Sequence, residues 1–443
     1  MVAPVNTSEI EGSSGTVEET NRCNNNGEQL AINYYEFPRF PSDLLKIGRE
    51  RGYIAPRTIA IGPYYHGKPE LQRMENVKRT AVRLFIDGLD LGGGLTPAII
   101  EPIIGSVQDC YGDMDAVRKI TDADFCYMMF IDGCFLLLFM CSGMFRRGIV
   151  PTETPENLDW RTGVIMQQDI RGIRRDIMLL ENQIPWAVIA RLMGPLRFLK
   201  EDIVNFLVDA YPSAIPKEYA SQQRVDIGGS HLLGLLLDLV HSKGQRISSL
   251  VSERTRTYHA SELAEMGIKL EARKTATANF TGVMNMEMVQ GLLCAKLAVQ
   301  PLNLGNASAC LLINMAALEL YSETALLKDA GELPVSSYLC VLGLMMSQAE
   351  DVRKLRHKGI VQGLFGDQHI LEFFKDLCPN LVAGQAYWQI FRDIEVYRKK
   401  RRLWLAIYKF VYKNAKTIAA VLSIVGVLVG IFKAILSLKS HHE

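Results

Sequence analysis

Residues Ile418 to Leu438 form an apolar segment of membrane-spanning length, with the sequence IAAVLSIVGVLVGIFKAILSL. A helix needs about 20 apolar residues to cross a bilayer. This segment carries one charge, Lys433, near enough to its end for the ammonium group to reach the headgroup region. It therefore predicts a transmembrane helix over residues 417–438, followed by a short tail over 439–443.

The stretch before this segment is basic and contains several aromatic residues. We predict a juxtamembrane helix over residues 396–416, because long cations and tryptophan are typical of a membrane interface. The cations lie on the N-terminal side of a late apolar segment, so the positive-inside rule predicts a tail anchor with a cytosolic body, at the plasma membrane or an endomembrane. They would also attract anionic lipid headgroups. The predicted interface residues are Arg398, Lys399, Lys400, Arg401, Arg402, Trp404, Lys409, Lys413 and Lys416.

The net charge of +1 is distributed unevenly along the chain. Residues 398–443 contain ten Lys or Arg and one acid and carry +9, so residues 1–397 carry −8. An acidic body argues against nucleic-acid binding, and a basic segment beside an apolar one favours a membrane. The nine cysteines show no metal-ligand spacing and indicate a reducing compartment.

A second apolar run, from Phe125 to Phe145, is also long enough to cross a bilayer. It contains Asp132, however, and an aspartate inside a span costs about 2.5–3.5 kcal/mol on insertion scales. We therefore predict that this run is a buried helix in the core of the body, with Asp132 paired to an arginine.

The remaining sequence predicts a mainly α fold. The expected architecture is a large multi-helix globular body with a small β-hairpin element and one C-terminal transmembrane helix. Polar residues dominate positions 1–32, which cannot bury enough apolar surface to fold, so we expect a disordered N-terminal tail there. The helical globular domain is expected over residues 33–395.

Periodic apolar residues locate individual elements of this body. Steps of three and four over Gln167–Trp186 predict one amphipathic helix that ends near Asn182 and Gln183. Another helix is expected over Tyr338–Leu355. Alternation with period two on both sides of Gln290-Gly291 predicts the β-hairpin.

Motifs of known chemistry are absent from the sequence. It has no GxxxxGK[ST] phosphate loop, no strand-coupled GxGxxG, no HExxH, no GxSxG and no EF-hand loop. Its eight histidines are scattered, and we expect neither a metal site nor a cofactor. A protein that acts through binding is therefore expected more than an enzyme.

Three short motifs stand out against this background. They are IGPYYHG at residues 61–67, DGCF at 132–135 and LENQIP at 180–185. The first combines turn-forming residues with aromatic side chains, the second places one carboxylate among apolar residues, and the third places polar side chains where an apolar helix must end. The residues singled out are Tyr64, Tyr65, His66, Asp132, Glu181, Asn182 and Gln183.

Two interpretations of these residues stay open. In the structural one, Glu181, Asn182 and Gln183 satisfy the backbone groups freed at a helix end and reach Asp132 or an arginine. In the functional one, Asp132 and Glu181 form a carboxylate pair for general acid–base catalysis. Nothing in the sequence shows that the two carboxylates meet, so we favour the structural interpretation.

In their order, the three motifs resemble those of the plant domain-of-unknown-function 247 family, whose members carry similar IGPYHHG, DGCF and LENQIP motifs. The resemblance covers about residues 35–438 and includes a C-terminal span. Two positions depart from the family pattern. Tyr65 stands where the family usually has a second histidine, and Ile313 stands where an Arg-Asn-Leu-Ile-Ala-Phe-Glu motif has its arginine.

The resemblance implies a mainly helical, membrane-anchored plant protein with no established enzyme activity. Some family members are implicated in self-incompatibility recognition in grass pollen. We therefore expect a membrane-anchored recognition or signalling protein that binds another protein. Two alternatives stay open: an enzyme of unknown reaction with a buried carboxylate pair, and a cell-surface self-incompatibility determinant whose body lies outside.

Overall fold

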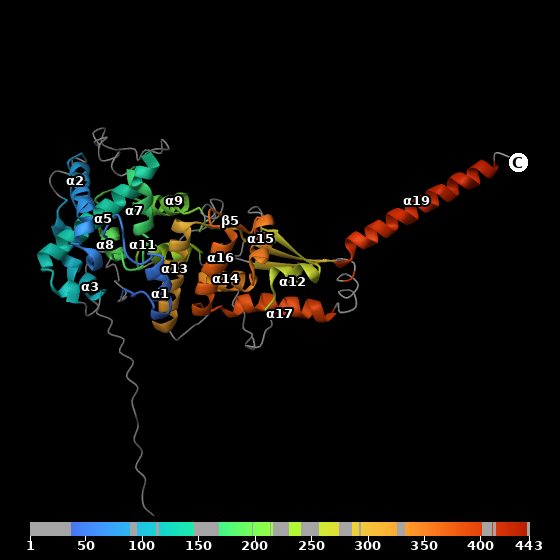
Figure 1. The fold of residues 1–443 in the computed structure, drawn as a ribbon. Helices are drawn as coiled ribbons and strands as arrows, with labels where there is room; N and C mark the ends of the chain where they lie inside the picture. The colour runs from blue at the N-terminus through green and yellow to red at the C-terminus, as the bar shows by residue number, and fades with distance from the viewer. Residues whose placement is uncertain are drawn as a thin grey trace, which may run out of the picture. The chain divides into compact units, whose positions relative to one another are not determined.

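The computed structural model describes residues 37–88, 95–111, 115–145, 168–196, 198–212, 214–215, 230–240, 257–273, 286–291, 294–325, 333–400, 410 and 413–440. The predicted disordered tail over 1–32 lies outside these residues, as does much of the predicted juxtamembrane helix over 396–416. The described part of the chain is mainly helical with two small sheets, which confirms the predicted mainly α class (Figure 1).

A long apolar helix, α5 (Asp122–Phe145), forms the centre of the N-terminal half. Its side chains are buried without interruption from Met128 to Met140. Helices α2 (Gln72–Gly88), α8 (Trp186–Met193) and α9 (Lys200–Ala210) pack against it. The other elements of this half are α1 (Ser42–Glu50), η1 (Pro63–Tyr65), η2 (Pro69–Leu71), η3 (Pro97–Ile99), η4 (Glu101–Ile103), α3 (Ile104–Asp109), α4 (Asp115–Arg118), α7 (Ile170–Asp176) and α11 (Leu232–Val240).

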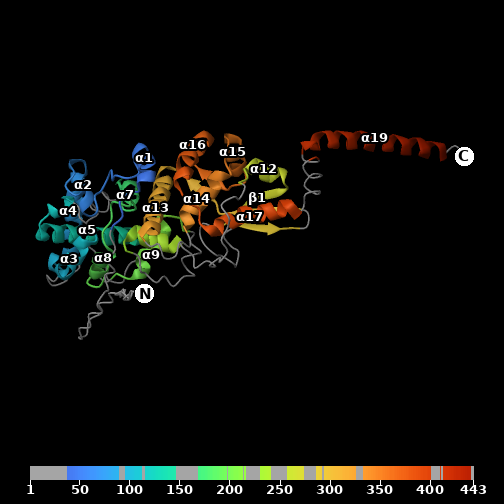
Figure 2. The same cartoon turned by 90° about the horizontal axis from the view of Figure 1, so that it is seen from below.

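A second core helix, α13 (Asn306–Ala325), joins this half to the C-terminal half. It contacts α1, α7 and α11 on one side and α14 on the other, and Figures 1 and 2 both show it between them. Every residue from Ala309 to Glu319 is buried, because α13 is surrounded by other elements. The helices of the C-terminal half are α12 (Ala260–Glu265), α14 (Pro334–Leu344), α15 (Ala349–His357), α16 (Asp367–Leu377), η5 (Cys378–Asn380) and α17 (Gln385–Lys400).

The strands are β1 (Ile268–Ala272), β2 (Met286–Gln290), β3 (Ala295–Val299), β4 (Leu302–Leu304) and β5 (Val361–Gly363). β2 and β3 pair antiparallel, which confirms the predicted hairpin. β1 lies parallel to β3 on its other edge, so the sheet order is β1-β3-β2. β4 and β5 form a separate parallel pair. The sequence analysis did not predict β1, β4 or β5. β4 and β5 have three residues each, too few to show a clear period, and β1 pairs with β3, which does not follow it directly in the sequence.

The helix predicted over Gln167–Trp186 is only partly correct. Helix α7 ends at Asp176, and the chain then turns until α8 begins at Trp186. The apolar residues predicted to share one stripe are still buried, Ile177 and Leu180 among them. The backbone carbonyls of Asp176 and Ile177 accept hydrogen bonds from side-chain amides instead of from the next helical turn, which ends the helix early.

The helix predicted over 338–355 is two helices, α14 and α15, with a break between them. Asp351 holds this break, because its carboxylate accepts the backbone N–H groups of Ser347 at 3.1 Å and Gln348 at 3.3 Å. Burial raises the pKa of Asp351, but hydrogen bonds from Ser261 and Ser347 outweigh burial and lower it. An aspartate placed three residues into a helix caps its free N–H groups in this way.

One helix of the described residues is long and apolar enough to cross a membrane, Asp122–Met140 within α5. Its most apolar window is 83% buried inside the body, as expected for the predicted core helix. The predicted C-terminal span falls within α19 (Ala415–Ser440), whose described apolar stretch, Thr417–Ile431, is shorter than a span. The structure therefore does not support the predicted C-terminal transmembrane helix.

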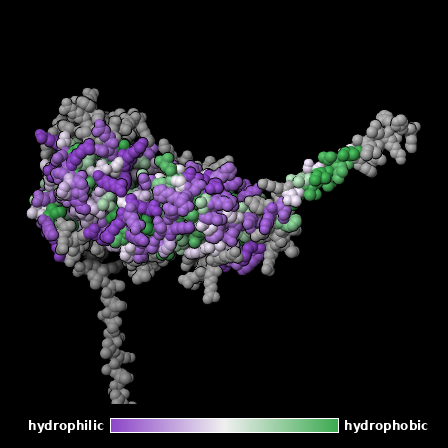
Figure 3. Space-filling model, in the orientation of Figure 1, coloured by the Kyte–Doolittle hydropathy of each residue, from purple (hydrophilic) through white to green (hydrophobic). Residues whose placement is uncertain are grey.

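The apolar side chains of α19 are exposed in the described part of the chain, and Figure 3 shows them as a hydrophobic stretch. The visible face of the body is mostly hydrophilic by comparison. Such a long exposed apolar surface is uncommon for a water-facing helix. The exposed residues are Val421, Leu422, Ile424, Val425, Val427, Leu428, Val429 and Ile431.

The predicted interface cations are described only in part. Arg398, Lys399 and Lys400 form the last turn of α17, where the first two pair with Glu395. Lys413 is exposed. Arg401, Arg402, Trp404, Lys409 and the side chain of Lys416 lie outside the described residues.

Candidate functional site

Asp132 lies on α5 and is 1% exposed. One carboxylate oxygen forms an ion pair with the fully buried Lys78 of α2, and the other accepts the backbone N–H of Gly62 at 2.8 Å. Lys78 also pairs with Glu75 at 2.7 Å and donates to the carbonyl of Ala60 at 2.8 Å. The prediction of an arginine partner is wrong. A lysine takes this role because α2 packs along α5 and places position 78 beside the carboxylate.

The IGPYYHG loop approaches the LENQIP segment at Gly62. This residue has a φ of +75°, and a Cβ built on it would lie 2.5 Å from the carbonyl oxygen of Gln183. The hydroxyl of Tyr111 donates to the same carbonyl at 3.0 Å. Glycine is therefore needed here for two reasons, a left-handed backbone and a close approach of two chain segments.

Asn182 pairs with the loop as a neighbouring strand would. Its side-chain oxygen accepts the N–H of Ile61 at 2.8 Å, and its amide donates to the carbonyl of Ile59 at 3.1 Å. The same amide donates to the carbonyl of Asp176 at 2.9 Å, at the end of α7. One fully buried side chain thus satisfies three backbone groups from two distant segments.

Gln183 completes the end of α7. Its amide donates to the carbonyls of Ile177 and Leu179, both at 2.8 Å, and its oxygen accepts the N–H of Leu233 at the start of α11 at 3.2 Å. The amides of Asn182 and Gln183 thus donate to carbonyls at and after the end of α7. The motif also fixes where α11 begins relative to α7.

Glu181 faces the other side of the loop. Its carboxylate accepts the N–H of Phe40 and the hydroxyl of Tyr65, each at 3.0 Å, and pairs with Arg39 at 3.3 Å. Burial and the nearby Glu181 carboxylate raise the pKa of Tyr65 far above its ordinary value, so its hydroxyl keeps its proton. Asp132 has different partners, and within the described residues no hydrogen bond joins the two carboxylates.

The other two singled-out loop residues lie at its edge. Tyr64 is half-buried, with its ring edge-on to Tyr111 at 5.5 Å and the guanidinium of Arg39 4.1 Å from its ring centre. His66 is half-buried as well, and its buried Nδ1 has no hydrogen-bond partner among the described residues.

The network therefore joins the three motifs in space, and all three lie within the range that matches a known family. A family model described as a plant protein of unknown function, the domain-of-unknown-function 247 family, matches residues 38–429. The chain belongs to this family. It is also 23% identical to the UPF0481 protein At3g47200 of Arabidopsis thaliana over 375 residues, which is 78% of this chain and 74% of that protein. No solved structure matches the chain.

Asp176 is a residue of this family member that the sequence analysis did not single out. Its carboxylate accepts three consecutive backbone N–H groups, from Arg57 at 2.9 Å, Thr58 at 2.6 Å and Ile59 at 3.1 Å. Arg175 pairs with its other oxygen. Burial raises the pKa of Asp176, and these donors oppose that rise. The only sequence signal for a buried role of Asp176 was its position beside the apolar stripe of the predicted helix. That signal is weak, because acids exposed to solvent occur at the same position of many helices.

The segment that lacks the family arginine still carries two structural side chains. Asn314 accepts the N–H of Leu180 at 2.8 Å, and Glu319 accepts the N–H of Val335 at 2.9 Å at the start of α14. Ile313 is fully buried in the apolar core. The missing arginine therefore leaves no buried acid of this segment without donors.

The chemistry available to this network is mainly structural. The buried carboxylates of Asp132 and Asp176 receive charge-assisted hydrogen bonds from backbone N–H groups, which is how buried charges are stabilised. Among the described residues, no group of three His, Cys, Asp or Glu side chains is arranged to bind a metal ion. The network joins the loop over 57–65 to α2, α5 and α7 and to the LENQIP segment, so it determines the packing of the N-terminal half.

Proposed function

We propose that this protein is anchored in a membrane by α19 and acts by binding another protein through its helical body, without catalysing a reaction. The observation that carries the proposal is the exposed apolar surface of α19. Its described side chains from Val421 to Ile431 include eight large hydrophobic residues that are 49–66% exposed.

Length and charge support the membrane assignment of α19. The helix has 26 residues, and at about 1.5 Å per residue it is long enough for the hydrocarbon core of a bilayer. Lys433 is the one charge between Ile418 and Leu438. The basic segment before the helix supplies cations for anionic headgroups and favours a cytosolic body at the plasma membrane or an endomembrane.

The motif network supports binding over catalysis. Asp132 and Glu181 are the obvious candidates for acid–base chemistry, and both are occupied by backbone N–H groups and cations. A carboxylate held in this way is stabilised in its place in the fold and has little freedom to exchange protons with a substrate. We therefore assign the motifs to folding and the recognition role to the surface of the body.

Membrane insertion is tested with charges placed in α19. The double variant I424R/L428R places two cations in the apolar stretch, each costing about 2.5–3.5 kcal/mol in a span. Wild-type chain should resist extraction with alkaline carbonate from microsomes, and I424R/L428R should be extracted. The matched control T417R adds a cation at the start of the stretch and should stay in the membrane. Extraction of the wild type would contradict the anchor.

Topology is tested by protease protection and glycosylation of the full chain in microsomes. Asn279 and Asn306 are the sequons of the body to follow. A digested, unglycosylated body supports the cytosolic orientation. A protected, glycosylated body would contradict that orientation and support the alternative of a cell-surface determinant.

The binding role is tested by cross-linking of the full chain in plant membranes. We expect an adduct with a second protein, heavier than the 49.6 kDa of the chain alone. A chain that stays at its own mass under conditions that cross-link other membrane complexes would contradict the proposal.

A further inference from the structure

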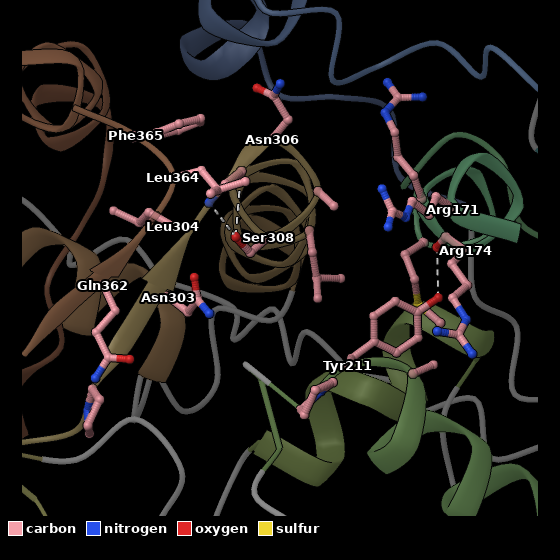
Figure 4. Close-up of a pocket in the computed structure, with 18 of the residues that line it drawn as sticks. Arg171, Arg174, Tyr211, Asn303, Leu304, Asn306, Ser308, Gln362, Leu364 and Phe365 are labelled. Atoms are coloured by element: carbon pink, nitrogen blue, oxygen red, sulfur yellow. Dashed lines mark hydrogen bonds between the residues drawn. The ribbon is translucent and has the colours of Figure 1, made fainter.

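A cavity of about 1130 Å³ is lined on one side by Arg171, Arg174 and Arg175 of α7. Its walls come from α7, the start of α13, β4, β5, α16 and the residues that follow α9. Figure 4 shows Arg171 and Arg174 on one side of this space, with Asn306 and Ser308 at the start of α13 between them and Gln362 on β5. A volume of this order is sufficient for a small organic molecule.

The charged groups that line the cavity are all basic. Arg171, Arg174, Arg175 and His369 belong to its wall, and among the described residues no aspartate or glutamate does. Two acids close to the wall already have cationic partners: Arg175 pairs with Asp176, while Arg51, which contacts His369, pairs with Asp376. The cavity therefore attracts anions.

Two of these guanidinium groups have no partner in the described part of the chain. Neither the guanidinium of Arg171 nor that of Arg174 forms a hydrogen bond or ion pair there, and the Nε of Arg174 is buried. The carbonyl of Arg174 accepts the Tyr211 hydroxyl at 2.7 Å, which fixes the backbone but uses no guanidinium donor. A buried guanidinium donor without an acceptor is costly, and an anionic ligand would supply the acceptor.

The start of α13 offers a second set of donors. The backbone N–H groups of Asn306, Ala307 and Ser308 have no acceptor within the helix, and all three residues line the cavity. The Ser308 hydroxyl is bonded to the N–H and carbonyl of Gly305, outside the helix (Figure 4). The first turn of α13 contains no acidic side chain. Its positive end therefore faces the same space as the arginines.

The rest of the wall is suited to an organic group. Leu304, Leu311, Phe365 and Met178 supply apolar surface, and Asn303 and Gln362 supply amides. We propose that this cavity binds a small organic molecule that carries a phosphate group. A phosphate has three terminal oxygens, enough for two arginine forks and the helix N-terminus together, whereas a carboxylate has two.

Phenyl phosphate is the first probe, in equilibrium dialysis with the full chain in neutral detergent. We expect saturable binding that becomes about tenfold weaker or more in R171Q/R174Q. Control R79Q removes an exposed arginine of α2 outside the cavity and should bind as the wild type does. R171Q alone removes an exposed side chain that has no partner to lose, so it keeps the test valid if R174Q disturbs folding.

Two further binding measurements identify the chemical class of the ligand and its source. Benzoate should bind more weakly than phenyl phosphate. Displacement of phenyl phosphate by vesicles containing phosphatidic acid would assign the phosphate to a lipid headgroup, and lack of displacement would assign it to a free phosphate ester. The proposal is wrong if phenyl phosphate does not bind saturably, if R171Q/R174Q binds it as tightly as the wild type, or if benzoate binds equally well. None of these results depends on membrane anchoring.

Discussion

The Nζ of Lys78 and the carboxylate of Asp132 form an ion pair at the centre of the N-terminal half, with side chains that are 0% and 1% exposed. Neither group reaches water, so each depends on the other and on the backbone for stabilisation. The remaining donors and acceptors come from Gly62, Ala60 and Glu75, which are all close to the IGPYYHG loop or α2. This pair therefore links the loop to the core helix.

We predict that K78M lowers the free energy of unfolding by about 3–5 kcal/mol, because it leaves a buried carboxylate without its cation. The double variant K78M/D132N should regain part of this loss, since asparagine is neutral and can still accept the Gly62 N–H. Urea unfolding of the full chain in neutral detergent measures both. The control R79M, at the exposed neighbouring position, should change stability by less than about 0.5 kcal/mol. Equal losses of stability in K78M and R79M would contradict the role of Lys78 as the stabilising partner of Asp132.

Two glycines of the loop form a matched pair for the next prediction. Gly62 and Gly67 have φ of +75° and +76°, but a Cβ at Gly67 would meet no atom within 4 Å. G67A should therefore cost about 1–2 kcal/mol for the left-handed backbone alone. G62A adds a clash with the Gln183 carbonyl and should cost at least about 2 kcal/mol more. Thermal unfolding compares the two variants, and similar losses would show that the close approach at Gly62 carries no penalty.

Glu181 and Tyr65 should show energetic coupling across their hydrogen bond. We expect E181Q, Y65F and the double variant to give a coupling energy of about 1 kcal/mol, reduced from the value for a fully buried charged pair because Glu181 is 12% exposed. The comparison cycle uses Y111F, whose hydroxyl bonds to the Gln183 carbonyl instead. That cycle with E181Q should be additive. Equal coupling in the two cycles would mean that the Tyr65 bond has no specific role.

His231 should make the stability of the body depend on pH. Burial lowers its pKa to about 3 in the folded protein, and its Nδ1 accepts the N–H of Gly234 at 3.1 Å. In the unfolded chain, the His231 imidazole binds a proton near its ordinary pKa of about 6.5. The buried imidazole of the folded chain does not bind a proton at that pH. Stability from this residue is therefore complete above about pH 6.5 and decreases as the pH falls, by up to about 1.4 kcal/mol per pH unit.

The variant H231N removes this titration but keeps an acceptor for Gly234. Between pH 7 and pH 5, its free energy of unfolding should decrease less steeply than that of the wild type. H357Q, at an exposed histidine of α15, should retain the wild-type slope. Parallel slopes for the wild type and H231N would show that His231 is not buried in its neutral form.

Local pattern was sufficient for several parts of the fold. Alternation around Gln290-Gly291 predicted the β2–β3 hairpin, because both strands and their turn are adjacent in sequence. The run from Phe125 to Phe145, with its single aspartate, predicted a core helix, and α5 is that helix. The order of the three motifs indicated the family, which the match over residues 38–429 confirms.

The candidate site was only partly visible in the sequence. Asn182 and Gln183 were singled out because polar side chains at the end of an apolar stripe must find partners, and they do. Asp176 and Asn314 were missed as members of the network. Their donors are backbone N–H groups of distant segments. Almost every residue type has a backbone N–H, so the amino-acid sequence does not identify these donors.

The sequence by itself determined the mainly helical class, the burial of α5 and the identity of the polar motif residues, because apolar periodicity and local turn chemistry act over a few neighbouring positions. Only the tertiary structure decided that Lys78 is the partner of Asp132 and that α7 ends at Asp176. The Lys78–Asp132 pair joins positions 54 apart in the chain. The Asn182 side chain that binds the carbonyl at the end of α7 also binds Ile59, which is 123 positions away. Packing brings such groups together, and the requirement that buried polar groups be satisfied then overrides local helical preference.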